Sequence, residues 1–210
     1  KNTDGSVRQH ERIGALAYGA ALPEQWGEKA RAVDFYDVKA DVESLLAGQN
    51  AVFVAAEHPA LHPGRSANIV IDGKTVGFIG ELHPKWLQQY DLPTAPLLFE
   101  LDLAVVQQRD KTVYRPVSKF QAVRRDLAFV LPESTAYADL EQALRGVASP
   151  LIREIALFDV YRGAGLPDNM KSMAVKILLQ DDDATLTDEA VEAVVAQLLA
   201  AAESVGAKLR

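Results

Sequence analysis

Residues 123–131 read Val-Arg-Arg-Asp-Leu-Ala-Phe-Val-Leu, and the fold can be worked out from this stretch. Leu127, Phe129 and Leu131 recur at every second position, which is the period of a strand with one buried face. The odd positions of residues 173–179 read Met-Val-Ile-Leu and repeat the pattern. The sequence therefore predicts two half-buried strands in the last hundred residues.

Two helical patterns lie among these strands. Tyr137, Leu140, Leu144 and Val147 share one helix face, and Ser134 and Thr135 precede them as N-cap candidates. A second apolar stripe runs through residues 191–205. With strands expected at 152–162 and 207–210 and a turn at 163–169, the order is β-α-β-β-α-β. This is the ferredoxin-like pattern, and the open face of such a sheet is a common platform for RNA.

The first 110 residues predict a mixed, mainly antiparallel sheet with few helices. Asp72-Gly73 lies between two strand-like runs and is a dipeptide favoured in two-residue hairpins. We expect strands at residues 13–22, 51–56 (short and buried), 67–72, 74–80 and 97–103, and helices at 38–46 and 84–90. The fold class expected for the whole chain is α+β.

Composition narrows the class of protein. The chain has 210 residues, 49% of them hydrophobic, and a net charge of −7, which excludes disordered, collagen-like and coiled-coil chains. No apolar run is long enough to span a bilayer, and the polar first residues are not a signal peptide. There is no cysteine, so thiol catalysis and cysteine-based zinc sites are excluded. The absence of an initiator Met suggests a fragment or a processed form.

Charge is unevenly distributed along the chain. Residues 1–110 carry 10 basic and 15 acidic side chains, residues 111–180 carry 10 and 7, and residues 181–210 carry 2 and 7. The middle third is thus the positive one. We expect a domain boundary between about residues 105 and 115, giving domains 1–110 and 111–210.

Patterns for metal binding or catalysis are weak. His58 and His62 are four residues apart, but prolines prevent a helix that would align them, and no further ligands follow at the usual spacing. We interpret this segment, like His83 before Pro84, as a rigid loop. The sequence also has no Walker phosphate loop and no Gly-x-Ser-x-Gly elbow, so we expect no metal site and no catalytic residues.

The ordered motifs resemble a known family. Residues 120–128, 158–163, 171–174, 178–180 and 185–189 resemble the ferredoxin-fold anticodon-binding domain, which ends the β subunit of bacterial phenylalanyl-tRNA synthetase. Residues 35–41, 58–67 and 77–84 look like that subunit's preceding domain, a degenerate and non-catalytic relative of the class II synthetase fold. The chain departs from the family pattern at Gln121, where proline is usual, and in its acidic residues 181–183.

The resemblance implies a C-terminal fragment of a far longer β subunit. It implies partners, namely the tRNA for phenylalanine and a synthetase α subunit in an α2β2 assembly, but neither DNA nor a membrane. ATP and magnesium would be handled by the α subunit, so this fragment would hold no cofactor and would not catalyse acylation. A cytoplasmic location is expected.

Anticodon recognition needs flat rings for unstacked bases and cations for phosphate. By the resemblance Tyr161 stacks on an anticodon base, while nearby basic and polar side chains hold the backbone or base edges. These candidate RNA-binding residues are Lys119, Arg124, Arg125, Tyr161, Arg162, Lys171, Ser172 and Arg210. Arg210 would join them only if the last strand pairs beside the first.

Other interpretations stay open from sequence. Ion pairs Arg125–Asp126 and Asp159–Arg162 could simply fix the rim of the sheet. The unit could be a stand-alone ferredoxin-like regulatory module that binds a small ligand or a protein, or the first domain could be an enzyme.

Overall fold

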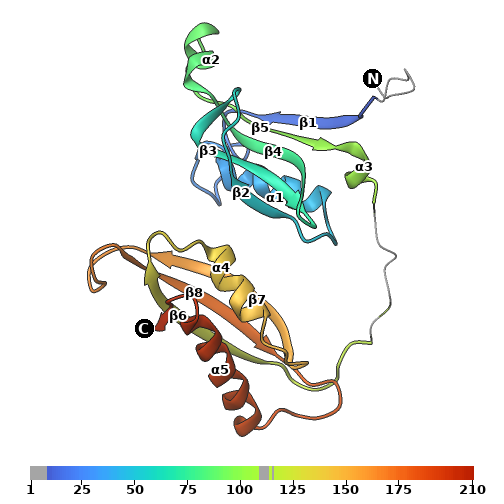
Figure 1. The fold of residues 1–210 in the computed structure, drawn as a ribbon, viewed down its shortest axis with the longest axis vertical. Helices are drawn as coiled ribbons and strands as arrows, with labels where there is room; N and C mark the ends of the chain where they lie inside the picture. Colours follow the sequence, from blue (N-terminus) through green and yellow to red (C-terminus); the bar gives the residue numbers. More distant parts are fainter. Residues whose placement is uncertain (1–8, 109–113, 115) are drawn as a thin grey trace. The chain divides into compact units, whose positions relative to one another are not determined.

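The chain divides into two compact units, residues 1–113 and 114–210. The computed structural model describes residues 9–108, 114 and 116–210, so the predicted boundary at 110/111 lies outside the described residues. Each unit is built on its own antiparallel sheet (Figure 1). Within the described parts of the chain, no helix has the length and apolar character needed to cross a membrane.

The C-terminal unit is a four-stranded sheet with two helices. Its elements follow the predicted β-α-β-β-α-β order, and all neighbouring strands are antiparallel in the sheet order β7-β8-β6-β9. This confirms the ferredoxin-like prediction. The elements are β6 (Val123–Pro132), α4 (Tyr137–Arg145), β7 (Ile152–Tyr161), β8 (Met170–Leu179), α5 (Asp188–Glu203) and β9 (Lys208–Leu209).

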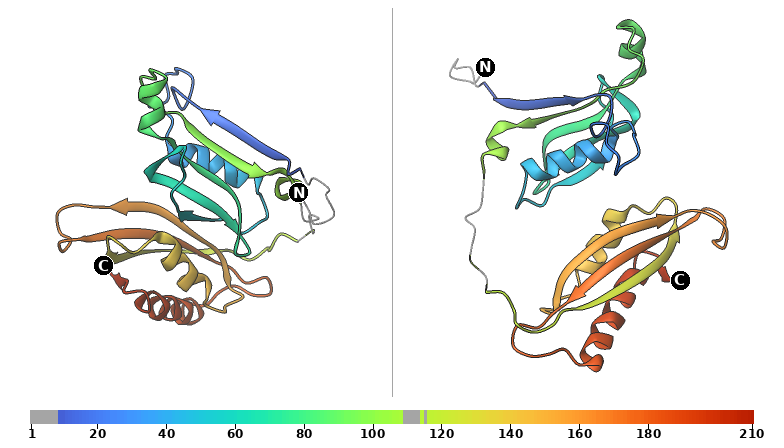
Figure 2. Two further views of the ribbon diagram at one scale, coloured as in Figure 1. Left: turned by 45° about the horizontal axis from the view of Figure 1, so that its top comes forward. Right: turned by 180° about the vertical axis from the view of Figure 1, so that it is seen from behind.

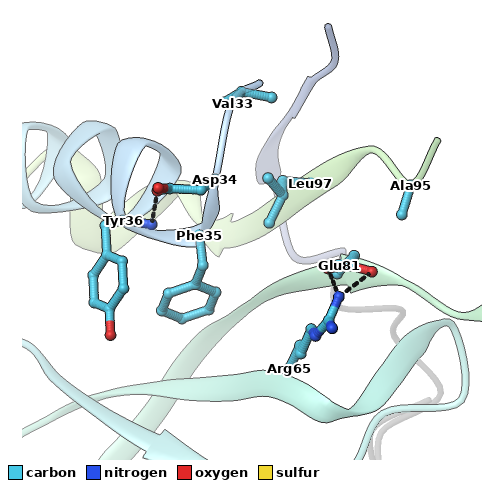
Figure 3. A pocket seen from close by; sticks show the side chains of 8 residues that line it. All are labelled: Val33, Asp34, Phe35, Tyr36, Arg65, Glu81, Ala95 and Leu97. Carbon is cyan, nitrogen blue, oxygen red and sulfur yellow. Dashed lines mark hydrogen bonds and ion pairs between the residues drawn. The ribbon is translucent and has the colours of Figure 1, made fainter. Parts of the chain in front are cut away.

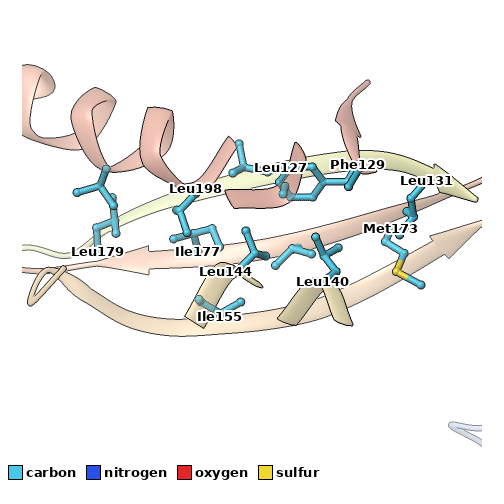
Figure 4. Packing of buried hydrophobic residues seen from close by; sticks show 14 of the residues in the cluster. Leu127, Phe129, Leu131, Leu140, Leu144, Ile155, Met173, Ile177, Leu179 and Leu198 are labelled. Atoms are coloured by element: carbon cyan, nitrogen blue, oxygen red, sulfur yellow. The ribbon is translucent and has the colours of Figure 1, made fainter. Parts of the chain in front are cut away.

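Both helices of this unit cover the same face of its sheet (Figure 2). Phe129 and Ile177 project from the sheet and are fully buried, as are Leu140 and Leu144 of α4 and Leu198 of α5. Figure 4 shows these side chains between the helices and the strands. The alternation read from the sequence thus separates this covered face from a second face, which we call the open face.

Capping explains where the two helices begin. The Thr187 hydroxyl accepts a hydrogen bond from the Ala190 N–H at the start of α5. The prediction of Ser134 or Thr135 as the cap of α4 was wrong. Its N-cap is Ala136, whose N–H donates to the Asp139 carboxylate, and the Thr135 N–H belongs to the preceding turn, where it donates to the Pro132 carbonyl.

The N-terminal unit is a five-stranded sheet in the order β1-β5-β4-β3-β2. All its neighbouring strands are antiparallel, so the expectation of a mixed sheet is corrected. The elements are β1 (Arg12–Ala17), α1 (Phe35–Leu45), β2 (Val52–Ala55), β3 (Leu61–Ile71), β4 (Lys74–Leu82), α2 (Pro84–Gln89), β5 (Leu97–Asp102) and α3 (Leu103–Val106).

Helix α1 covers one face of this sheet and buries Val38 and Val42 against it. The Asp72-Gly73 hairpin is confirmed, with positive φ at both residues. Three further expectations need correction, and one of them is the start of β3, which begins at Leu61 rather than at residue 67. The first strand ends at Ala17 rather than residue 22, before Gly19 takes φ +90°. Strand β2 is not buried, because it lies at the sheet edge and pairs only with β3.

Candidate nucleic-acid interface

The open face of the four-stranded sheet is formed by alternate residues of its strands. Tyr161 of β7, Ser172 of β8, Val130 of β6 and Lys208 of β9 form one row across it. The helices pack on the opposite face, where Leu127, Phe129 and Leu131 point. Within this unit, therefore, neither α4 nor α5 covers the open face.

Tyr161 ends β7 with its ring partly accessible, at 38% of its full exposure. Its hydroxyl donates to the Ala164 carbonyl at 3.1 Å. A Cβ on Gly163 would lie 2.8 Å from that hydroxyl oxygen, so the glycine makes room for the ring. The turn after β7 thus holds the ring in one orientation, which suits a surface on which a base can stack.

Arg210 reaches Tyr161 from the opposite edge of the sheet. Strand β9 pairs with β6, and the Arg210 N–H donates to the Ala128 carbonyl at 2.8 Å. Its guanidinium lies over the Tyr161 ring, 5.4 Å from the centroid, which is cation–π distance. The condition placed on Arg210 from sequence, pairing of the last strand beside the first, is met.

Three further predicted residues lie near the Tyr161 end of the sheet. Arg162 forms an ion pair of 2.7 Å with Glu133, and this guanidinium lowers the pKa of the Glu133 carboxyl. Lys171 is buried on the helix-covered side and donates to the Glu133 carbonyl. Ser172 is the cross-strand neighbour of Tyr161 and is also buried. Lys171 and Ser172 therefore support the strand ends rather than present accessible polar groups.

The other three predicted residues lie at the opposite end of β6. Arg124 is on the open face, and Asp126 holds its guanidinium with bonds of 2.8 and 2.9 Å, which raises the pKa of Arg124. Arg125 has the alternate orientation, toward the helix side. Lys119 is exposed in the loop before the strand. The structure thus does not gather the eight residues into one cluster.

The ion pairs considered from sequence are differently partnered. Asp126 pairs with Arg124 rather than Arg125, because residues two apart on a strand share a face. Arg162 pairs with Glu133 across the strand ends.

Two open-face residues were missed by sequence reasoning. Lys208 is exposed at the β9 end of the Tyr161 row. Phe158 is 52% exposed and lies 5.7 Å from the Arg124 guanidinium. Lys208 could have been found once β9 was paired with β6. Phe158 could not, since its orientation depends on an irregularity in β7.

A pocket of about 360 Å³ in the N-terminal unit lies beside the start of α1 (Figure 3). Its charged groups are engaged within the unit: Arg65 pairs with Glu81 at 2.8 Å, and Asp34 accepts the Tyr36 N–H as the helix cap. The pocket is therefore better described as a gap in the packing, between an ion pair and a helix terminus, than as a site with free reactive groups.

The histidines considered as metal ligands have local structural roles. His62 and His83 accept backbone N–H bonds from Gly64 and Lys85, and the His58 ring stacks on Phe78 at 4.2 Å. Among residues 9–108, 114 and 116–210, no group of three or more His, Asp or Glu side chains is placed to hold a metal ion.

Comparison with known proteins links both units to one family. Residues 1–103 match the family model described as the phenylalanyl tRNA synthetase beta chain CLM domain. Residues 118–210 match the ferredoxin-fold anticodon binding domain. The whole chain is 62% identical to 27% of the phenylalanine–tRNA ligase beta subunit of Neisseria gonorrhoeae. It is 51% identical over 202 residues, or 96% of the chain, to 26% of the Chromobacterium violaceum subunit. The chain thus spans about a quarter of the length of these relatives.

Proposed function

We propose, since the chain belongs to the phenylalanyl-tRNA synthetase β-chain family, that its C-terminal unit binds the anticodon region of tRNA(Phe). The observation that carries this proposal is the accessible, fixed ring of Tyr161 on an open sheet face, flanked by Arg210 and Lys208. Unstacked bases bind to such rings, and cations beside them neutralise phosphates.

The roles follow from where each side chain lies. Tyr161 stacks on a base, and Arg210 steadies the ring from the C-terminal strand. Arg124, Arg162 and Lys119, all at exposed positions, attract the RNA backbone. The remaining three candidates, Arg125, Lys171 and Ser172, contribute mainly by holding the sheet in shape, since Lys171 and Ser172 are buried and Arg125 faces the helix side.

The N-terminal unit serves as a scaffold in an assembly with the synthetase α subunit, in the cytoplasm, in an α2β2 arrangement. That assembly uses ATP and magnesium ions to attach phenylalanine to its tRNA. The pocket beside α1 does not fit these groups, because Arg65 and Glu81 neutralise each other and Asp34 is committed to the helix cap. We therefore assign the acylation chemistry to other parts of the assembly.

Binding of a tRNA(Phe) transcript, measured by fluorescence anisotropy at several salt concentrations, tests this proposal. We expect micromolar or weaker binding that falls steeply with salt, because phosphate contacts release counterions. Tyr161→Ala should weaken binding by about 1–3 kcal/mol through loss of stacking, whereas Tyr161→Phe keeps the ring and should bind nearly as well. Tyr36→Ala, which removes an exposed ring from the N-terminal unit, is the matched control.

Other results would favour other interpretations. Binding that does not depend on salt concentration would support the alternative of a stand-alone regulatory module. Tight binding of an amino acid without tRNA binding would support the same alternative. Acylation of tRNA by this chain alone would contradict the scaffold role of the N-terminal unit.

A further inference from the structure

An irregularity in β7 places a second aromatic ring on the open face. Residues three apart on a regular strand point to opposite faces, so Phe158 and Tyr161 should not lie on the same side. The register of β7 against β8 shifts between Leu157 and Asp159, as a β-bulge does. Leu157 and Val160 pack into the core, and Phe158 projects with Tyr161 on the other side.

The surroundings of Phe158 resemble those of Tyr161. Each ring is accessible, and each has an arginine guanidinium within 6 Å of its centroid, Arg124 for Phe158 and Arg210 for Tyr161. Asp126 binds two nitrogens of Arg124 and so fixes the guanidinium plane. Guanidinium planes and aromatic rings are the two kinds of surface on which splayed bases stack.

The two rings are too far apart to serve a single base. Three residues of strand span about 10 Å, whereas stacked bases are separated by about 3.4 Å. Between the two rings the open face carries Ala174 of β8, Ala128 of β6 and the exposed Asp159 of β7, so two small side chains and one carboxylate separate the rings. A strand of RNA crossing this face would therefore meet two separate stacking surfaces.

We infer that Phe158 is a second base-stacking residue, so that the open face takes two unstacked nucleotides of one RNA strand, one on Tyr161 and one on Phe158. This inference rests on the proposed function and extends it. It also gives Arg124 a specific position, beside the second nucleotide and held there by Asp126.

The test uses tRNA(Phe) transcripts that carry 2-aminopurine at one anticodon-loop position at a time, because the fluorescence of this base reports stacking. Binding of the 210-residue chain should change the signal at two loop positions. Phe158→Ala should weaken binding about 5- to 150-fold and abolish the change at one position, while the position sensitive to Tyr161→Ala keeps its change.

Three further variants make the result specific to the ring. Phe158→Leu retains an apolar side chain for the strand and should bind as poorly as Phe158→Ala, so it carries the test if the alanine variant unfolds. Phe158→Trp should restore binding. Tyr36→Ala should bind like the unaltered chain.

The results distinguish the second stacking position at Phe158 from anticodon binding by the C-terminal unit. If Tyr161→Ala weakens binding but Phe158→Ala and Phe158→Leu bind like the unaltered chain, the second stacking position is wrong and the anticodon-binding proposal stands. If the unaltered chain shows no salt-dependent binding and no loop position responds, both are wrong.

Discussion

The five-stranded and four-stranded sheets each bury one face under helices, and their other faces carry different side chains. On the N-terminal sheet that face displays Leu16 and Val54, and Arg12 pairs with Glu100 at 2.8 Å. On the C-terminal sheet Arg124 and Arg210 lie over aromatic rings, and Arg124 is also paired with Asp126. Each sheet thus supplies a flat surface, and the placement of cations against rings or carboxylates decides what that surface can bind.

The largest effect is expected from a substitution that destabilises only the C-terminal unit. Leu198→Ala removes a fully buried side chain between α5 and the strands and should cost about 2–5 kcal/mol of unfolding free energy. Binding of tRNA should be lost at temperatures where this unit unfolds. Hydrogen exchange would show faster exchange in residues 116–210, with residues 9–108 unchanged. Gln197→Ala, exposed on the same helix, is the control; equal effects of the two variants would contradict the packing argument.

A second substitution destabilises the N-terminal unit instead. A Cβ on Gly77 would lie 2.1 Å from the Glu100 carbonyl oxygen, and backbone cannot move aside as a side chain does. Gly77→Ala should therefore destabilise this unit by about 3 kcal/mol. Both tryptophans, Trp26 and Trp86, belong to it, so tryptophan fluorescence during urea unfolding measures the change.

Gly27→Ala provides the control for that substitution, because a Cβ there meets no atom within 4 Å. If Gly77→Ala abolished tRNA binding under conditions where the C-terminal unit stayed folded, RNA binding could not be assigned to the four-stranded sheet alone.

The smallest expected effect is on the acid sensitivity of each unit, which depends on one ion pair in each of them. The Arg31 guanidinium donates to Asp37 and lowers the pKa of that carboxyl to about 2, and Arg162 lowers the pKa of Glu133. A lowered pKa in the folded state stabilises the fold above the ordinary pKa, and this contribution is lost as the pH falls through the folded value.

Unfolding free energy measured from pH 5 down to pH 2 tests this expectation. Asp37→Asn should reduce the acid dependence of the N-terminal unit between about pH 4 and 2. Glu133→Gln should likewise reduce the acid dependence of the C-terminal unit, at pH values below the usual pKa of a glutamate. Both effects are small because the side chains are partly exposed. Unchanged pH profiles in both variants would show that neither ion pair contributes.

Sequence reasoning found the strands and helices of the C-terminal unit because burial is periodic along β6, β8 and both helices. The motif and the expected last strand predicted Tyr161 and Arg210 as RNA-binding residues; the structure places the Arg210 guanidinium over the Tyr161 ring, and their contact with RNA stays a prediction. Sequence reasoning could not give the orientation of a side chain where that orientation depends on a neighbouring strand. Lys171 was expected to contact RNA, yet its ammonium is buried on the Glu133 carbonyl. Phe158 was not considered, since the bulge that turns it outward has no local signal.

The amino-acid sequence by itself determined the two sheets, the ferredoxin-like order and the family, because alternation, helical spacing and motif order are local properties of the chain. Only the tertiary structure decided which side chains share the open face. It placed Arg210 over Tyr161 and Arg124 over Phe158, residues separated by dozens of positions along the chain. Such pairs arise from strand order and register, which long-range packing sets and no short stretch of sequence encodes.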